Sequence, residues 1–315
     1  MKSLRLIVGL SLAVLPVRAA AQEHAHDAHA GHAAAADPAL QAQIEAVRAA
    51  TARYRDHANA VKDGFRLFGQ EGTLMGEHWY RRDLVRGPLD LRRPATLQYA
   101  NIGGRKVLVG VAYSVYRRPG EPLPEGFAGA ADHWHTHDVA RLADAATRDR
   151  PMLHWLVQRR IEKGKVGPGG RSLLTMVHAW VWLDNPDGTF AQQQRALPYL
   201  RAGLPAAWAA GGDTASAEGI QLVAPGACRG EVARMDRIAR LDRAQARALA
   251  AACEQHAARL RTLVDPRGDA GATNAAAARA WEGYLLARGR ILRPEQSARI
   301  QTVMAAAMEH EMTGM

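Results

Sequence analysis

The chain has 315 residues, of which 48% are apolar, 23% charged and 6% aromatic. This composition excludes a disordered tail protein and a collagen-like repeat, and it provides enough apolar residues to bury a core. Lys and Arg outnumber Asp and Glu by 41 to 31, giving a net charge of +10. Because the arginines are spread along the chain rather than gathered in one stretch, this excess does not indicate a nucleic-acid-binding protein.

The first 21 residues have the three parts of a secretory signal peptide. Lys2 and Arg5 form the charged start, residues 6–15 form an apolar stretch, and small residues precede a cleavage position before Gln22. The apolar stretch is shorter than the roughly 20 residues that span a bilayer. We expect a periplasmic or secreted protein with no stable membrane insertion after signal cleavage; the alternative is an uncleaved anchor.

Residues 22–37 form a low-complexity segment that contains four of the 13 histidines, namely His24, His26, His29 and His32. The segment has nothing apolar to bury, so it is predicted to be disordered. It suits a low-affinity collector of metal ions.

Residues 38–202 are predicted to form an α+β domain. Apolar residues from Leu40 to Phe65 recur at spacings of three and four after an Asp37-Pro38 start, which predicts one long N-terminal amphipathic helix. Residues 107–116 alternate as a strand, and Gly103-Gly104 predicts a hairpin with residues 95–101. Residues 176–183 are predicted as another strand that a turn at 185–188 ends, and residues 150–161 as a helix. The expected core is an antiparallel sheet or a barrel-like arrangement.

The last third of the chain is predicted to be a small helical domain. Residues 203–226 contain Gly and Pro and are interpreted as a linker, and residues 227–315 carry three apolar stripes at helical spacing. Cys228 and Cys253 both fall in this part. An oxidising compartment favours a disulfide between them, and the alternatives are two buried thiols or a soft metal site.

The strongest local signal is the heptapeptide 132–138, Asp-His-Trp-His-Thr-His-Asp. On an extended backbone His133, His135 and His137 point to one face. Imidazole suits Zn, Cu, Fe and Ni, and Asp132 or Asp138 is placed to ligate the ion or to orient a ring. The alternative interpretation is an exposed polar loop without a ligand.

Two further histidines fall on predicted strands. His78 follows Glu77, and His178 shares an expected face with Trp180 and Trp182. Each taken alone suits a core histidine that donates to a carbonyl oxygen. A curled sheet would instead bring them to the histidines of the heptapeptide, with Glu77 nearby as a general base. The candidate ligands of a Cu or Zn ion are therefore the following: His78, His133, His135, His137 and His178.

A methionine pattern and the lack of several catalytic and nucleotide-binding motifs restrict the classes of function that the sequence supports. Met304, Met308 and Met312 recur every four residues, a pattern typical of core packing or of a soft Cu(I) site. The motifs GxSxG, GxGxxG and HExxH and the P-loop do not occur in the sequence. The leading hypothesis is an exported metal-binding or metal-handling protein. The alternatives are a cupin-like metal-dependent enzyme and a helical periplasmic stress or chaperone-like interaction module, so enzymatic activity is left open.

Residues 54–199 resemble a group of secreted bacterial domains of unassigned activity. The motifs that carry the resemblance are Met75-Gly76-Glu77-His78-Trp79, Leu108-Val109-Gly110-Val111-Ala112-Tyr113, and the run from His178-Ala179-Trp180 through Asn185-Pro186-Asp187-Gly188 to Phe190. The resemblance implies a shared fold in which His78 and His178 recur. It also implies an acidic residue at position 112, where this chain has Ala112.

The tail is distantly similar to periplasmic helical proteins of envelope stress and heavy-metal resistance that carry paired LTxxQ motifs. The matching pieces are Leu241-Asp242-Arg243-Ala244-Gln245 and Leu292-Arg293-Pro294-Glu295-Gln296, and both lack the Thr. The first piece is a helix start in which Asp242 caps and Gln245 follows three residues later. In the second, Pro294 fits the first helical turn.

Overall fold

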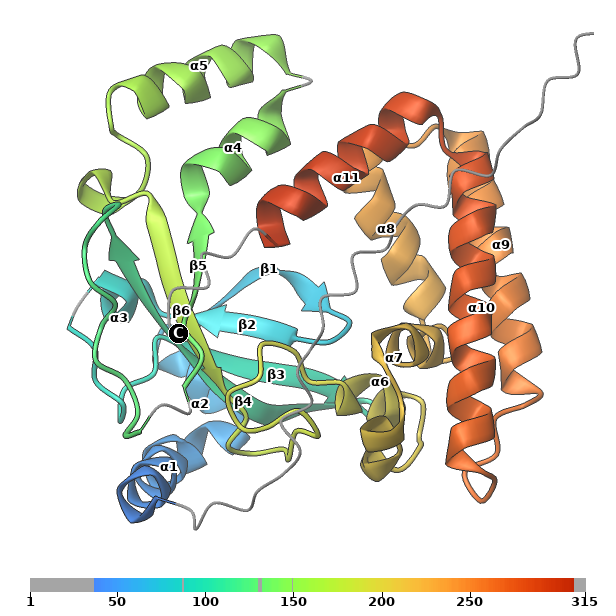
Figure 1. Ribbon diagram of the computed structural model, residues 1–315, viewed down its shortest axis with the longest axis horizontal. Coiled ribbons are helices and arrows are strands. Elements are labelled where there is room, and N and C mark those ends of the chain that lie inside the picture. Colours follow the sequence, from blue (N-terminus) through green and yellow to red (C-terminus); the bar gives the residue numbers. More distant parts are fainter. Residues whose placement is uncertain (1–36, 87, 130–131, 149, 309–315) are drawn as a thin grey trace, which may run out of the picture. The chain divides into compact units, whose positions relative to one another are not determined.

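A six-stranded antiparallel sheet lies at the centre of the α+β fold, which confirms the predicted class (Figure 1). The computed structural model describes residues 37–86, 88–129, 132–148 and 150–308. The predicted signal peptide and almost all of the His-rich segment lie outside these residues. In sheet order the strands are β1 Arg66–Gly72, β2 Gly76–Tyr80, β3 Thr96–Ile102, β4 Arg105–Arg117, β6 Leu173–Ala179 and β5 His135–Asp138.

The predicted hairpin is present as β3 and β4. Gly103 and Gly104 both have positive φ, 57° and 74°, as a two-residue turn of this hand requires. The predicted alternation along β4 changes phase, because Gln98 pairs with Gly110 whereas Tyr99 pairs with Leu108. Val109 is therefore an extra residue in β4, and the side chains that precede it point to the face opposite to the one that simple alternation predicts.

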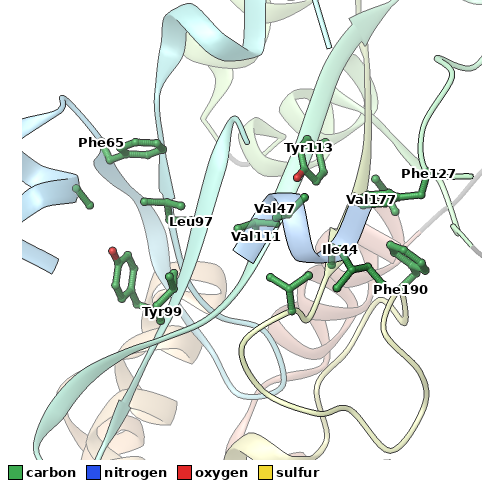
Figure 2. Packing of buried hydrophobic residues seen from close by; sticks show 14 residues of the cluster. Ile44, Val47, Phe65, Leu97, Tyr99, Val111, Tyr113, Phe127, Val177 and Phe190 are labelled. Carbon is green, nitrogen blue, oxygen red and sulfur yellow. The ribbon is translucent and has the colours of Figure 1, made fainter. Parts of the chain in front are cut away.

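One face of the sheet packs against the N-terminal helices. Helix α1, Pro38–Thr51, begins at the cap Asp37 and buries Ile44 and Val47 on the sheet. Figure 2 shows these two side chains in the cluster around Val111 and Val177. The full cluster of buried residues is Ile44, Val47, Ala60, Phe65, Leu97, Tyr99, Leu108, Val111, Tyr113, Phe127, Val177, Ala179, Val181 and Phe190.

The predicted long helix is divided into three pieces. After α1 come the 3₁₀ turn η1, Ala52–Arg55, and helix α2, His57–Lys62. Asp56 between them is extended, and its carboxylate accepts a hydrogen bond from the backbone N–H of Ala58. Asp is a good N-cap, so this residue begins a new helix and interrupts the old one.

Strand β6 ends at Ala179, four residues earlier than predicted. The backbone N–H of Trp180 donates to Thr189 rather than to a neighbouring strand. The indole of Trp182 donates to the hydroxyl of Thr51 at 3.0 Å, so Trp182 packs toward α1 and does not share the face of His178. The predicted turn is present, with the Gly188 N–H donating to Asn185 at 3.0 Å.

The elements after β5 form a helical hairpin. Helix α4, Val139–Thr147, follows β5 directly, and helix α5, Pro151–Glu162, agrees with the helix predicted for residues 150–161. Two short elements complete this part of the chain: helix α3, Arg82–Arg86, and the 3₁₀ turn η2, Pro168–Gly170.

The segment predicted as a linker, residues 203–226, contains the 3₁₀ turn η3, Ala206–Gly211, and helix α7, Thr214–Gln221. Helix α7 packs so closely on α10 that a Cβ at Gly219 would lie 2.0 Å from the carbonyl oxygen of Ala277. The segment therefore belongs to the folded core. The other helices of this part are α6 Ala196–Arg201, α8 Ala227–Ala239, α9 Arg243–Arg261, α10 Ala270–Ile291 and α11 Pro294–Met308.

The two LTxxQ-like motifs meet through their glutamines. The side chains of Gln245 and Gln296 exchange two hydrogen bonds, of 2.7 and 3.1 Å, and both residues are buried. Each side-chain oxygen also accepts a backbone N–H at the start of its own helix, from Asp242 and Arg293 respectively. The predicted helix starts are confirmed, and the glutamines tie α9 to α11.

A disulfide joins Cys228 of α8 to Cys253 of α9, as predicted. None of the helices among the described residues has the length and apolar character needed to cross a bilayer.

Candidate functional site

The pairing of β2, β3, β4 and β6 sets the floor of the site. Residues that pair directly across antiparallel strands point to the same face of a sheet. His78 pairs with Gln98, and Gln98 pairs with Gly110. Ala112, two residues further along β4, pairs with His178. His78 and His178 therefore lie on one face, opposite to the face that α1 covers.

Strand β5 adds two more histidines to this face. His135 pairs with Met176, and His137 pairs with Leu174. Met176 and Leu174 alternate with His178 along β6, so their side chains point to the same side. Four of the five predicted ligands thus share one face of the sheet.

The sheet must be strongly curved for these side chains to meet. Strands β2 and β6 are three strand spacings apart, which is about 14 Å in a flat sheet. The ring centres of His78 and His178 are nevertheless only 5.5 Å apart. The face that carries the histidines is therefore concave, in keeping with the predicted barrel-like core, although β1 and β5 are open edges of the sheet.

The spacing of the rings suits a shared ion. The ring centres of His178 and His135 are 5.1 Å apart, and those of His135 and His137 are also 5.1 Å apart. An imidazole nitrogen lies about 2.0 Å from a bound zinc ion, so the ring centre lies roughly 3 Å from it, and two imidazoles on one tetrahedral ion have centres about 5 Å apart. The observed spacings match that value.

His178 has one satisfied and one unsatisfied nitrogen. Its side chain is fully buried, and its Nδ1 lies 2.7 Å from the carbonyl oxygen of Gln192. A carbonyl oxygen only accepts, so Nδ1 carries the proton and Nε2 presents a lone pair. This Nε2 is buried and has no hydrogen-bond partner. A backbone carbonyl on one nitrogen and an unprotonated second nitrogen are the arrangement found in metal-ligating histidines.

The surroundings keep the rings neutral. Burial, with a smaller contribution from His137, lowers the pKa of His78 to about 4. Burial also lowers the pKa of His178 well below its usual value, and the neighbouring His135 and His78 lower it further. The hydrogen bond to Gln192 acts in the opposite direction. Near neutral pH both rings are unprotonated, which is the form that binds metal.

The ligating atoms do not yet converge. Among the described residues, no group of three or more His, Cys, Asp or Glu side chains has its ligating atoms placed to hold a metal ion. The ring centres have the required spacing, whereas the nitrogens do not point to one centre. A closed coordination sphere would require the imidazoles to turn about their side-chain bonds.

In the heptapeptide 132–138, the structure differs from the prediction at His133 and at the two aspartates, Asp132 and Asp138. His133 lies before β5 and is exposed, so the extended segment that presents histidines to one face begins only at His135. Asp132 accepts a hydrogen bond from the backbone N–H of Phe127 at 3.0 Å. Asp138 caps α4. Both carboxylates therefore hold backbone and do not orient a ring of the cluster.

Glu77 is on the wrong face to serve as a base for this site. It pairs with Tyr99, whose side chain belongs to the core on the opposite side of the sheet. Its carboxylate bonds to Lys106 and accepts the indole N–H of Trp79 at 2.7 Å. Burial acts to raise the pKa of Glu77, but these hydrogen bonds leave it lower than usual. The prediction that Glu77 lies near the histidines is wrong.

Two hollows on the surface of the described residues have linings that contain none of the clustered histidines. One is lined by Asp63, Gly64, Arg81, Arg82 and Asp83. The other is lined by Val85, Pro88, Val115, Tyr116, Glu121, Pro168, Gly169 and Arg171. Neither is lined by a histidine of the cluster.

Two glutamines of the site were not predicted. Gln98 is fully buried in the row of His78, and its side-chain oxygen has no hydrogen-bond partner. Its position in the predicted strand 95–101 was the only sequence feature that could have indicated the face on which Gln98 lies. Gln192 orients His178 through its backbone carbonyl, a contact that no side-chain pattern reveals. Other predicted metal-binding residues lie outside the described part of the chain, namely His24, His26, His29, His32 and Met312.

Comparisons of the chain with known protein families, with curated proteins and with solved structures found no match.

Proposed function

We propose that this chain is an exported metal-binding or metal-handling protein that holds a Cu or Zn ion through His78, His135, His137 and His178. The single observation that carries the proposal is the Nε2 of His178, which is buried and has no hydrogen-bond partner. The imidazoles of His78, His135 and His137 surround this ring. A buried polar atom without a partner costs about 1–3 kcal/mol. A metal ion at this nitrogen would remove that cost.

The donor set favours borderline metals over hard ones. The two cysteines are joined in a disulfide, so they supply no thiolate. Position 112, at the centre of the floor, carries alanine and therefore adds no carboxylate beside His178. The remaining donors are imidazoles, which suit Cu and Zn better than Mg or Ca.

The sequence and the disulfide support the export part of the proposal. Residues 1–21 have the pattern of a signal peptide, and disulfides persist mainly in oxidising compartments. The four histidines before residue 37 would collect metal ions with low affinity. Handling rather than catalysis has the better support, because Glu77, the candidate general base, faces the other side of the sheet.

The test is metal binding by a chain that begins at Asp37, which keeps the compact unit and removes the His-rich segment. Tag-free protein is analysed for bound metal and then titrated with Zn²⁺ and Cu²⁺ in a calorimeter. We expect one ion per chain. His178→Ala should weaken binding at least about 100-fold, since it removes the oriented ligand.

The matched control is His133→Ala, which removes an exposed histidine of the same heptapeptide. It should leave the affinity unchanged. A wild-type chain that binds neither ion, or equal affinity in wild type and His178→Ala, would refute the proposal.

A further inference from the structure

Helix α5 has an outward face that is apolar at its start and basic at its end. Large apolar side chains are exposed in its first two turns: Met152 by 73%, Leu153 by 39%, Trp155 by 55% and Leu156 by 48%. Such a group of exposed apolar side chains on one helix is the mark of an interaction surface. None of the residues of α5 is buried.

The basic residues continue the same face. Met152, Leu156, Arg159 and Lys163 recur at spacings of three and four, so they form one stripe along the helix and its C-terminal end. Arg160 lies beside this stripe and is exposed. From 151 to 165 the chain has four cations and one acid: Arg159, Arg160, Lys163 and Lys165 against Glu162.

The opposite side of α5 is already occupied by α4. His154 contacts the hydroxyl of Thr147 at 3.4 Å, and the side-chain amide of Gln158 donates to Asp144. Figure 1 shows α5 lying along α4, beside the edge of the sheet where β6 and β5 lie. The outward stripe is therefore a second face of the helix that the packing on α4 does not use.

We propose that this outward face of α5 docks the protein on an anionic lipid surface. An interfacial helix buries Trp, Leu and Met at the level of the lipid headgroups and keeps Lys and Arg beside the phosphates. Trp155 has the amphipathic ring that favours this depth, and the guanidinium of Arg159 lies 5.6 Å from the centre of that ring. The helix lies on the membrane and does not cross it.

The charge of the face selects this partner over a second copy of the chain. Two copies meeting through α5 would bring eight cations together against two acids, which costs electrostatic energy. An anionic bilayer offers the complementary charge, and each Lys or Arg near such a surface adds to the binding. This inference does not depend on the proposed metal site.

The test is co-sedimentation of the chain from Gln22 onward with two kinds of vesicle, one of phosphatidylcholine alone and one of phosphatidylcholine mixed with phosphatidylglycerol. This chain contains the whole compact unit and lacks the apolar stretch 6–15. We expect binding to the anionic vesicles, much weaker binding to the neutral ones, and release as salt is raised.

Two double variants separate the apolar and basic parts of the face. Trp155→Ser with Leu156→Ser, and Arg159→Glu with Arg160→Glu, should each weaken binding at least about tenfold. The matched controls are Leu263→Ser with Leu286→Ser, which remove exposed apolar side chains elsewhere, and Arg243→Glu with Arg247→Glu on α9. The controls should bind like the wild type.

Three results would overturn the proposal. The first is no binding to anionic vesicles, and the second is binding that neither α5 variant weakens. The third is self-association that the α5 variants abolish while vesicles are not bound, because the face would then be a protein interface. Circular dichroism of each variant checks that the fold is retained.

Discussion

His78 should make the folded protein sensitive to mild acid. In the unfolded chain a histidine has its usual pKa of 6.5, whereas in the folded chain burial lowers the pKa of His78 to about 4. The unfolded state therefore binds the proton more tightly. The stability that His78 permits is present above pH 6.5 and is lost as the pH falls from 6.5 toward 4.

The size of the effect follows from these two values. Between pH 7 and pH 5, a histidine whose pKa falls from 6.5 to about 4 on folding reduces the free energy of unfolding by about 2 kcal/mol. His178 adds to the same trend because its pKa is also lowered. Replacing His78 by glutamine removes its share at every pH.

The assay is urea unfolding of the chain from Asp37 at pH 7, 6 and 5, with a chelator present so that no metal competes with the proton. The difference in stability between pH 7 and pH 5 should be about 2 kcal/mol smaller in His78→Gln than in the wild type. His133→Gln, at an exposed ring, should keep the wild-type pH dependence. If His78→Gln also keeps it, the ring of His78 is not held in its neutral form by the site, and the reasoning fails.

Three other predictions concern packing and the floor of the site. Gln296→Leu should cost about 1–3 kcal/mol, because it removes both hydrogen bonds to Gln245 and those to the carbonyl oxygens of Ala239 and Arg240. In urea unfolding, the double variant with Gln245→Leu should lose less stability than the sum of the single losses, and additive losses would contradict the reciprocal pair. Gly219→Ala should destabilise the fold by about 1–3 kcal/mol, because its Cβ would meet the carbonyl of Ala277. Gly230→Ala in α8, where a Cβ would meet open space, should stabilise the fold by roughly 0.5 kcal/mol, and equal thermal midpoints in the two variants would contradict the close contact at Gly219. Ala112→Glu should raise the affinity for Zn²⁺ about tenfold or more in calorimetry, since it places a carboxylate directly beside His178, and an unchanged affinity would argue against an ion at this point of the floor.

Local patterns predicted the elements better than their ends. The alternation of residues 107–116 and the Gly103-Gly104 turn predicted β3 and β4, because both signals depend on near neighbours in the chain. The phase change at Val109 was not predictable from alternation, since an extra residue in one strand shows only against its partner. The linker prediction failed for a related reason. A glycine such as Gly219 looks like loop composition, but here it allows α7 to approach the backbone of α10 at Ala277 closely.

The site was predictable in part for the same physical reason. Period two correctly placed His135 and His137 on one face, and the same rule places Glu77 on the face opposite to that of its neighbour His78. What the sequence could not supply was the curvature of the sheet, which brings β2 within reach of β6. Nor could it show that the carbonyl of Gln192 holds His178, because backbone groups leave no mark in the residue pattern.

The energetics of the cluster support the proposed metal site better than a purely structural role. A core needs no imidazole at His178, where an apolar side chain would fill the space without leaving a buried nitrogen unpaired. The neighbouring His78 makes the fold more sensitive to acid, as argued above. Gly110 leaves room for the side chains of Gln98 and Trp180, which would lie 3.1 and 3.0 Å from a Cβ at that position, and Ala112 adds no polar group beside His178. An ion bound by the imidazoles would give the buried Nε2 of His178 a partner. By competing with protons, it would also reduce the sensitivity of the fold to acid. Stability measured with and without Zn²⁺ should therefore differ in the wild type and not in His178→Ala.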